Sequence, residues 1–453
     1  MTFSGNASSP SVNISITIDP SQTGATIDGF GASLTDSSAF LLPQLKSSSP
    51  TLYNQTMHYL FNQRIGLGIV RVPIGTTDFS PESHQYTFAD TIGMVQSETD
   101  WDAYLTNFNT YGASNYLFPT LKDALAINPS LKISILPWSP PGWMKDSNSP
   151  NGGSLINGAG PLHAEYLAKS AQAFKTALGV TPWGLAVQNE PSHQALYPSM
   201  NMTNDVEAIV LAALRGRLGE MDMGSIKLWG HEDNFDSWAQ AAQLIMSNSS
   251  MLDGTSFHCY NGSYSVIPGF IQAVGTSGSG KALSMSECSG QDTGEAASSS
   301  YNWWMNNIFM PLTQYDFSSI IVWNIALDQN FGPRLESAYC DNCKGILTID
   351  GTTVESNVQA AMLSHMSVAT SDLSRFGGGP AVRLNTTVSN ATSACLKAQT
   401  FAAPWVASNT AGKRRYGMVV QNNCTDANLT VAMNSAVMNV TAPYGLTSLV
   451  WTA

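Results

Sequence analysis

The chain has 453 residues, of which 43% are hydrophobic and only 11% are charged, whereas about a quarter are charged in an average protein. Its 20 basic and 32 acidic residues leave a net charge of −12, and no basic run exceeds the triplet at 413–415, so nucleic-acid binding is not expected. No apolar run reaches about 18 residues, which argues against a membrane-spanning helix.

Short apolar runs of β-forming residues recur along the first three quarters of the chain. Eight of them are found, at 25–33, 65–75, 131–140, 182–191, 225–233, 254–261, 281–290 and 318–328. Between them lie segments whose apolar residues recur every three or four positions, which indicates helices at 115–128, 162–179, 204–221 and 234–248. Alternation of strand and helix predicts an α/β protein with a parallel sheet. Eight such units predict a (β/α)₈ TIM barrel.

The pattern changes after about residue 365. Short alternating runs at 381–390, 394–403, 416–423, 429–436 and 446–453 are separated by Gly, Asn and Pro, which is typical of antiparallel strands. The opening segment "VNISITIDPSQ" has the same character. We therefore expect a fused antiparallel β-sandwich built from 1–24 and 365–453, beside a barrel at 25–364. The alternative is a disordered, glycosylated tail, against which a Cys395–Cys424 bridge would argue.

Features of secretion are spread over the chain. It has eleven Asn-x-Ser/Thr sequons, crowded toward the C-terminus, and these favour a glycosylated, extracellular protein. The stretch "MTFSGNASSP" has no apolar core, so we expect a signal peptide to have been removed. The sequons expected to carry glycans are Asn13, Asn54, Asn201, Asn385, Asn390 and Asn428.

The six cysteines are an even number, compatible with three disulfides outside the cytosol. Cys340 and Cys343 form one CxxC motif within the polar segment "ESAYCDNCKG". A zinc site would need a second pair of ligands at matching spacing, and a thioredoxin-like site would need a preceding strand and a following helix. A local structural disulfide is therefore favoured over a redox or metal role.

Polar and aromatic residues collect where the expected barrel strands end, which is where TIM-barrel enzymes carry their active sites. Reading the strand ends in order gives Arg71 and Asp78, Trp138 and Trp143, Asn189 and Glu190, His231 with Glu232 and Asp233, His258 and Tyr260, Glu287, and Trp323 with Asn324. Glu190 and Glu287 thus close strands four and seven. Two carboxyl groups flanking an anomeric carbon perform glycoside hydrolysis, one as an acid of raised pKa and the other as nucleophile.

The surrounding residues suit a sugar substrate. Trp138, Trp143, Tyr260 and Trp323 offer flat apolar faces for pyranose rings. Arg71, Asp78, Asn189 and His258 offer hydrogen bonds to hydroxyl groups, and His231 is also expected to contact the substrate.

Structural readings stand beside these functional ones. A single glutamate at a strand end can be purely structural, His258 taken alone reads as a polar wall residue, and Arg71 can pair with Glu287 as a buried cation, which would lower the pKa of that carboxyl. His231, Glu232 and Asp233 could suggest a metal, but adjacent side chains on one strand point in different directions. We expect no metal and no cofactor.

The motifs "DGFGASLTDSSAFLL", "RVPIGTTDFS", "LPWSPPGWMKDSNSPNGG", "VQNEP", "FHCYNG", "MSECSG" and "VWNIALDQNFGP" follow one another in order. From about Gly24 to its end the chain resembles glycoside hydrolase family 30, whose retaining enzymes combine a (β/α)₈ barrel with a β-sandwich. The resemblance implies that Glu190 is the acid/base and Glu287 the nucleophile. It also implies a sugar-binding site lined by Arg71, Asp78, Trp138, Asn189, His258, Tyr260 and Trp323.

Within the family, the segments around 116–132 and 137–155 look most like the fungal endo-β-1,6-glucanases. This implies cleavage of β-1,6-glucan, with the two carboxyl groups about 5–5.5 Å apart as retention requires. The alternatives are another specificity of the family (glucosylceramidase, β-glucosidase or xylanase) and, from another class, a catalytically silent carbohydrate-binding protein.

Cys259 and Cys288 each follow an inward-facing residue, on strands six and seven, which are neighbours in a barrel. We predict a disulfide between them behind the active site, with two free buried thiols as the alternative. The absence of a linker or separate binding module favours a monomer.

Overall fold

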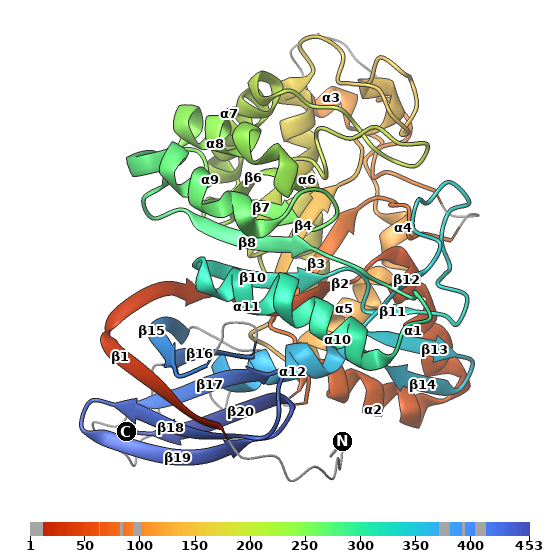
Figure 1. Ribbon diagram of the computed structural model, residues 1–453. Helices are drawn as coiled ribbons and strands as arrows, with labels where there is room; N and C mark the ends of the chain where they lie inside the picture. Colours follow the sequence, from red (N-terminus) through yellow and green to blue (C-terminus); the bar gives the residue numbers. More distant parts are fainter. Residues whose placement is uncertain are drawn as a thin grey trace.

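The structure of the protein is a computed structural model that describes residues 12–62, 64–81, 85–93, 101–370, 381–391, 395–403 and 414–453. Eight parallel strands close into a barrel (Figure 1). In order around the ring they are β2 (Gly29–Ser33), β3 (Ile69–Ile74), β4 (Lys132–Pro137), β5 (Gly184–Ala186), β6 (Lys227–Asn234), β7 (Gly254–His258), β8 (Ala282–Glu287) and β10 (Phe317–Val322). The expected TIM barrel is confirmed.

Helices connect the barrel strands and surround them. They are α1 (Asp36–Ser48), α2 (Pro50–Phe61), α3 (Trp101–Tyr104), α4 (Tyr111–Ser114), α5 (Leu117–Ile127), α6 (Gly160–Leu178), α7 (Asn204–Glu220), α8 (Trp238–Asn248), α9 (Ile267–Val274), α10 (Ala297–Trp304), α11 (Met310–Gln314) and α12 (Val358–Thr370). The four helices predicted from apolar periodicity correspond to α5, α6, α7 and α8. The N-cap of α7 is Thr203, whose hydroxyl accepts from the Val206 amide, so this helix begins directly after a typical capping residue.

A second sheet is built from both ends of the described chain. Its seven strands, in order across the sheet, are β19 (Ala436–Ala442), β18 (Ala427–Met433), β1 (Val12–Ile27), β15 (Ala381–Ser389), β16 (Leu396–Ala403), β17 (Arg415–Asn422) and β20 (Gly445–Thr452). Side chains from all seven strands share one hydrophobic cluster. The seven strands therefore share one apolar face and form a single unit with its own hydrophobic core.

Two details of this sheet differ from the sequence prediction. β1 pairs in parallel with β18 and antiparallel with β15, so the side domain is not entirely antiparallel. β19 was not among the expected strands. It is an edge strand whose residues are mostly exposed or half-buried, so it lacks the apolar alternation that reveals a half-buried strand.

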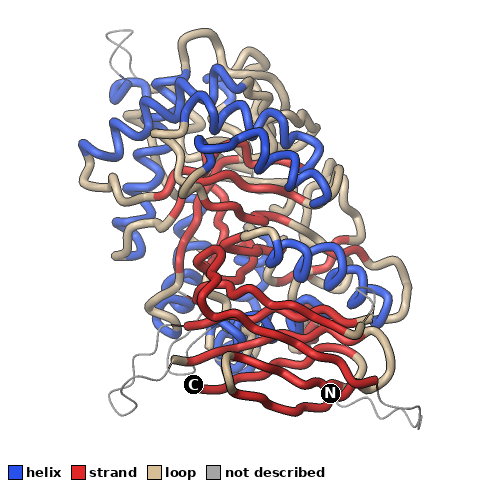
Figure 2. The backbone as a smooth tube through the Cα atoms, turned by 60° about the vertical axis from the view of Figure 1, so that its left-hand side comes forward, coloured by secondary structure: helices blue, strands red, loops and turns tan. Residues whose placement is uncertain are grey.

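The side domain and the barrel share packing surfaces. β1 runs from the side sheet to the barrel wall, and both views place the side sheet on one flank of the barrel (Figures 1 and 2). α12 contacts β16, β17 and β20 on one side and β2 on the other. The hydrophobic cluster of the barrel continues through Met366 of α12 to Phe401 and Val419 of the side sheet, so the two parts share a core.

The expected division of the chain at 24/25 and 364/365 stays a prediction. The elements nearest to those points are β1, which ends at Ile27, and α12, which ends at Thr370. Within the described residues, none of the helices combines the length and apolarity needed to cross a membrane.

Short strands in the loops after β8 and β10 complete the rim of the barrel. β9 (Gly290–Gln291) pairs with β12 (Cys343–Lys344), and β11 (Ala326–Leu327) lies in a small sheet with β13 (Leu347–Asp350) and β14 (Thr353–Ser356). The loops that follow β8 and β10 are therefore joined at the mouth of the barrel.

All six cysteines are paired, as Cys259–Cys288, Cys340–Cys343 and Cys395–Cys424. The Cys259–Cys288 pair has a Cα–Cα distance of 5.3 Å and joins the ends of β7 and β8. The three predicted bridges are confirmed, and the CxxC motif is a local disulfide.

Candidate active site

A cavity of about 600 Å³ opens at the carboxyl ends of the barrel strands. Seven of the residues predicted from the sequence line it, namely Asp78, Trp138, Asn189, Glu190, Tyr260, Glu287 and Trp323. Both predicted catalytic carboxyl groups therefore share one cavity. Arg71 and His258 lie beneath its surface and contact those carboxyl groups directly, at 1% and 0% exposure.

Arg71 organises the floor of the cavity. It lies inside β3, which continues to Ile74, so it does not end the strand as predicted. Its Nη1 donates to Glu287 Oε2 at 2.6 Å, its Nε to Glu232 Oε1 at 3.1 Å and its Nη2 to Asn189 Oδ1 at 2.7 Å. The predicted Arg71–Glu287 ion pair is present. The planar guanidinium thus holds side chains of β8, β6 and the segment after β5 in one arrangement.

Glu287, the last residue of β8, is held through both carboxyl oxygens. Oε2 accepts from Arg71, and Oε1 accepts from the Tyr260 hydroxyl at 2.8 Å. Its side chain is 7% exposed. A carboxyl group fixed at both oxygens and facing the cavity has the orientation that a nucleophile needs before its substrate arrives.

Glu190 follows the short strand β5 and is aimed by a strained backbone. Its φ is +44°, a left-handed conformation that costs a non-glycine residue about 1–2 kcal/mol. Its amide donates to the Glu232 carbonyl at 2.8 Å, and its carbonyl accepts from the His193 amide at 2.9 Å. These bonds hold the turn, and strained turns of this kind are common at active sites.

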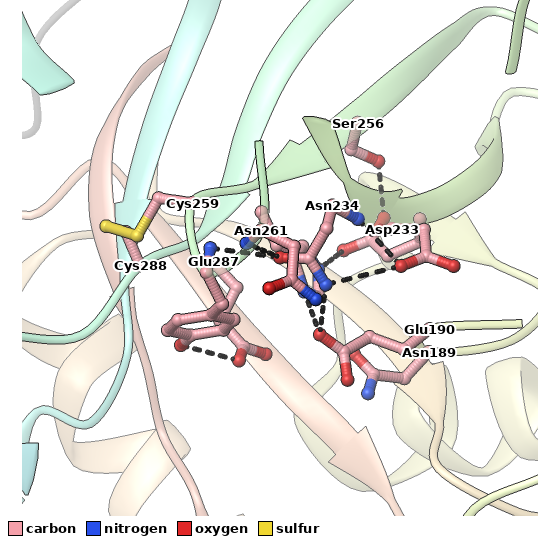
Figure 3. A network of polar contacts seen from close by, with 12 residues as sticks. Asn189, Glu190, Asp233, Asn234, Ser256, Cys259, Asn261, Glu287 and Cys288 are labelled. Carbon is pink, nitrogen blue, oxygen red and sulfur yellow. Dashed lines mark hydrogen bonds and ion pairs between the residues drawn. A yellow bond between two sulfur atoms is a disulfide. The ribbon is translucent and has the colours of Figure 1, made fainter. Parts of the chain in front are cut away.

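The two carboxyl oxygens of Glu190 have different surroundings. Oε1 accepts from His258 Nδ1 and from Asn234 Nδ2, each at 3.0 Å. Asn234 is itself fixed, because its Oδ1 accepts from the amides of Tyr260 and Asn261 (Figure 3). Among the described residues, the hydrogen bonds to this carboxyl group go to Oε1. Oε2 is therefore available to exchange a proton with a substrate.

The pKa of Glu190 lies below its ordinary value, contrary to the raised value expected for the acid. Burial raises the pKa of Glu190, but the hydrogen bond and positive charge of His258, together with the charge of His193 and the hydrogen bond from Asn234, lower it further than burial raises it. Burial lowers the pKa of His258, but the carboxylates of Glu287, Glu190 and Glu232 raise it to about 10. The resting pair is therefore an imidazolium facing a carboxylate, a partner that the sequence did not reveal.

A pH profile of the His258→Gln variant tests this pairing. An acid must be protonated to act, so kcat/KM falls as pH rises through the pKa of Glu190. Removing the imidazolium takes away the two largest contributions that lower the pKa of Glu190, so burial counts for more and that pKa rises. We expect the alkaline limb of the profile to move to higher pH by about one unit or more. An unmoved limb, or one shifted to lower pH, would contradict the pairing. His58→Gln, at an exposed position of α2, is the control.

The three acidic or basic residues near the end of β6 point to different places. His231 has a φ of +50° and directs its ring toward Glu207 of α7, with Nδ1 3.6 Å from Oε2. It lies outside the cavity lining, so no contact between His231 and substrate is proposed. Glu232 is bound by Arg71 and by the Ser256 hydroxyl, and Asp233 accepts from the Ser192 amide. Within the described residues, no three side chains of His, Cys, Asp or Glu are grouped so that they could hold a metal ion.

Aromatic rings form the wall beside Glu287. Trp138 and Trp323 stack with their centroids 5.2 Å apart, and the Arg71 guanidinium lies 4.8 Å from the Trp138 ring. Trp143 does not join them. A turn of 3₁₀ helix at Gly142–Met144 directs its ring away from the cavity, where Nε1 donates to the Ala89 carbonyl at 2.7 Å. Trp143 is not among the residues that line the cavity, so no sugar contact is proposed for it.

Asp78 has an unusual electrostatic setting. Burial, together with the charges of Glu287 and Glu190, raises the pKa of Asp78 to about 8. At neutral pH this side chain is therefore largely protonated and can donate a hydrogen bond as well as accept one.

Several residues of the cavity were not predicted. Asn234 follows directly after the residues noted at the end of β6, and extending that strand by one position would have found it. His193, Tyr197, Trp303 and Tyr339 also line the cavity. They come from loops or from a helix after a loop, where no strand periodicity indicates which side chains turn inward.

Comparison with known proteins agrees with this geometry. The chain is 28% identical to the endo-1,6-beta-D-glucanase of Neurospora crassa over 354 residues, 76% of this chain and 70% of that protein. It is 31% identical to mouse lysosomal acid glucosylceramidase over 185 residues, 39% of this chain and 33% of that protein. The solved structure of the endo-beta1,6-glucanase BT3312 superposes with a TM-score of 0.81 at 26% identity, over 96% of this chain and 93% of that one.

The family comparison covers more than half of the chain. Residues 27–265 match the glycosyl hydrolase family 30 TIM-barrel domain, and the matched segment contains Arg71, Glu190, Asn234 and His258. The resemblance stated from the sequence motifs is confirmed. This chain belongs to glycosyl hydrolase family 30.

Proposed function

We propose that the protein hydrolyses the β-1,6-glucosidic bonds of β-1,6-glucan with retention of configuration. The observation that carries the proposal is the pair formed by Glu190 and Glu287 across one cavity. One carboxyl group is fixed by a buried arginine and a tyrosine hydroxyl, and the other keeps an oxygen available for proton exchange. A separation of about 5–5.5 Å between these groups stays a prediction of the retaining mechanism.

In the first step, the Glu287 carboxylate attacks the anomeric carbon of the sugar that is held between the tryptophan wall and Tyr260. The bond from that carbon to the bridging oxygen breaks, and its electron pair goes to the oxygen. Glu190, in its protonated form, gives its proton to that oxygen from Oε2. The products are a glucosyl ester of Glu287, a shortened glucan with a free hydroxyl, and an ionised Glu190.

In the second step, Glu190 Oε2 removes a proton from a water molecule at the position that the leaving sugar vacated. The water oxygen attacks the anomeric carbon, and the ester bond to Glu287 breaks with its electron pair returning to the carboxylate. The two successive inversions leave the product in the β configuration. At the end, Glu190 is again protonated and Glu287 is again a carboxylate. The imidazolium of His258 stabilises the Glu190 carboxylate that accumulates between the steps.

Asn189 has a supporting role in this proposal. Its Oδ1 accepts from Arg71 at 2.7 Å, which orients the amide and assigns its Nδ2 group to the sugar. A donor there suits the 2-hydroxyl, whose hydrogen bonds strengthen in the oxocarbenium-like transition state.

The choice of β-1,6-glucan over a glucosylated lipid rests on the extent of similarity. The fungal endo-1,6-beta-D-glucanase matches about three quarters of this chain, whereas the lysosomal glucosylceramidase matches well under half. The BT3312 enzyme extends the likeness to 96% of the chain, including the side domain.

We also propose that the protein is secreted and glycosylated and acts as a monomer. Three disulfides support an oxidising location. Five of the six expected sequons have exposed asparagines, at Asn13, Asn54, Asn385, Asn390 and Asn428. Asn201 is only half-buried.

The substrate is tested by incubating the wild type and Glu190→Gln with pustulan, laminarin, glucuronoxylan and glucosylceramide and resolving the products by size. We expect mixed short oligosaccharides from pustulan alone, and a loss of turnover in the variant on the order of 10²–10⁴-fold. Glu355→Gln, at an exposed position of β14, is the matched control. Cleavage of laminarin, xylan or lipid in place of pustulan would overturn the substrate.

A further inference from the structure

The cavity extends beyond the catalytic carboxyl groups to a cluster of three rings. His193, Tyr197 and Tyr339 line it together with Glu190 and Glu287. Tyr339 lies 5.4 Å from Tyr197 and 5.6 Å from His193, measured between ring centroids. A volume of about 600 Å³ is in the range of sites for ligands of drug size, so the cavity has room beside the sugar that is attacked.

The Tyr339 ring is open to this space. It is 62% exposed, although it belongs to the cavity lining. The ring plane of Tyr339 meets that of Tyr197 at 73° and that of His193 at 75°, so neither neighbour stacks on the tyrosine. The exposed part of the ring is therefore available to a ligand, while the two aromatic contacts restrain its position.

The loop that carries Tyr339 is fixed on both sides of it. Before it, the Leu335 amide donates to the Asp78 carbonyl at 2.8 Å. After it, the Cys340–Cys343 disulfide closes a tight loop that leads into β12. This backbone places the ring before any substrate binds.

A second set of contacts fastens the same loop to the one that follows Glu287. β12 pairs with β9, the Asp292 amide donates to the Asn342 carbonyl at 2.8 Å, and Lys344 forms an ion pair with Asp292 at 2.7 Å. The exposed ring is therefore mounted on a cross-linked rim.

The position of the cluster identifies the part of the substrate that it faces. His193 and Tyr197 come from the loop that carries Glu190, and the His193 amide donates to the Glu190 carbonyl. Through His193 and Tyr197, the ring cluster thus adjoins the acid. The acid protonates the leaving oxygen, so the departing sugar must lie beside the acid.

We propose that Tyr339 is the stacking platform of the leaving-group subsite and binds the glucosyl unit that departs in the first step. The inference rests on the proposed function, because it requires a carbohydrate leaving group. The apolar face of that glucose would lie on the tyrosine ring. This contact aligns the bridging oxygen with Glu190 Oε2, and it also holds the sugar that accepts the glucosyl group in the reverse direction.

Two substrates separate this role from a structural one. A β-1,6-linked gluco-oligosaccharide places a sugar in the leaving-group subsite, whereas β-gentiobiosyl fluoride has a leaving group too small to reach Tyr339. We expect Tyr339→Ala to lower kcat/KM for the oligosaccharide by about tenfold or more and to leave hydrolysis of the fluoride within about twofold of wild type. Tyr339→Phe keeps the ring and should stay within about threefold of wild type on both substrates.

The controls make each outcome decisive. Tyr111→Ala removes a tyrosine that is 78% exposed and lies outside the cavity lining, and it should change neither reaction. An oligosaccharide rate unchanged in Tyr339→Ala, an equal loss on both substrates, or a loss in Tyr339→Phe as large as in Tyr339→Ala would overturn the inference. A wild type that cleaves the fluoride but no β-1,6 oligosaccharide would instead contradict the proposed function.

Discussion

The Glu287→Ala variant is expected to lose turnover on pustulan by a factor on the order of 10⁴ or more, because no group remains to form the covalent intermediate. Azide is small enough to occupy the space left by the carboxyl group. With β-gentiobiosyl fluoride as donor, azide should restore turnover and give the α-configured glycosyl azide, since it attacks from the face that Glu287 occupied. The product's configuration is read by NMR.

Glu190→Ala is the companion variant and should give the opposite product. Here the glycosyl ester on Glu287 still forms from the fluoride, because fluoride needs little help from an acid, and azide then attacks the ester from the other face. The expected product is the β-configured azide. Glu355→Gln should form no azide adduct beyond the wild-type level. A β azide from the Glu287 variant, or an α azide from the Glu190 variant, would mean that the two roles are exchanged.

Arg71→Met is expected to destabilise the fold by about 3–5 kcal/mol, the usual cost of removing one partner of a buried ion pair. Arg71 is 1% exposed and contacts two carboxylates, Glu287 and Glu232, as well as Asn189. The free energy of unfolding, measured with urea near neutral pH, checks the value. Glu287→Gln combined with Arg71→Met should recover part of the loss, because one of the stranded charges is gone.

The loss should also depend on pH. Burial raises the pKa of Glu232, but the positive charges of Arg71 and His258 and the hydrogen bond from Ser256 bring it down to about 2. A carboxyl whose folded-state pKa is depressed adds stability above its unfolded pKa, and that stability is lost as pH falls toward the folded value. The difference between wild type and Arg71→Met should therefore shrink as pH falls below about 4.5. A difference below 1 kcal/mol at neutral pH would contradict the buried network.

Much of the fold follows from residue periodicity. The eight strand runs and four helices fell where predicted, because each buries a continuous apolar face that local sequence reveals. The parallel pairing of β1 with β18 was beyond such an analysis. It joins segments more than 400 residues apart in the chain, and the choice between parallel and antiparallel pairing depends on the path between them.

The candidate catalytic pair was predictable for a similar reason. Glu190 and Glu287 each follow an apolar strand, and a barrel brings the ends of its strands to one face. Two residues of the predicted site lie outside the cavity lining, and the direction of each side chain depends on local backbone geometry. Trp143 belongs to a turn of 3₁₀ helix, and His231 itself adopts a left-handed conformation. Neither conformation is apparent from strand periodicity.

Electrostatics were the least predictable part. The sequence suggested a raised pKa for the acid, because a buried carboxyl in isolation behaves so. The structure instead places the imidazolium of His258 at 3.0 Å from Glu190. That contact lowers the pKa of Glu190 instead of raising it. Such a pairing depends on the distance between the ends of β5 and β7, which only the assembled barrel provides.

The measurement that tests the central claim most directly is the configuration of the first product. Wild-type protein is mixed with pustulan in an NMR tube, and the anomeric protons of the released reducing ends are followed before mutarotation equilibrates them. The account predicts that the β anomer appears first and the α anomer follows as it forms spontaneously. Initial release of the α anomer would contradict the double displacement through Glu287.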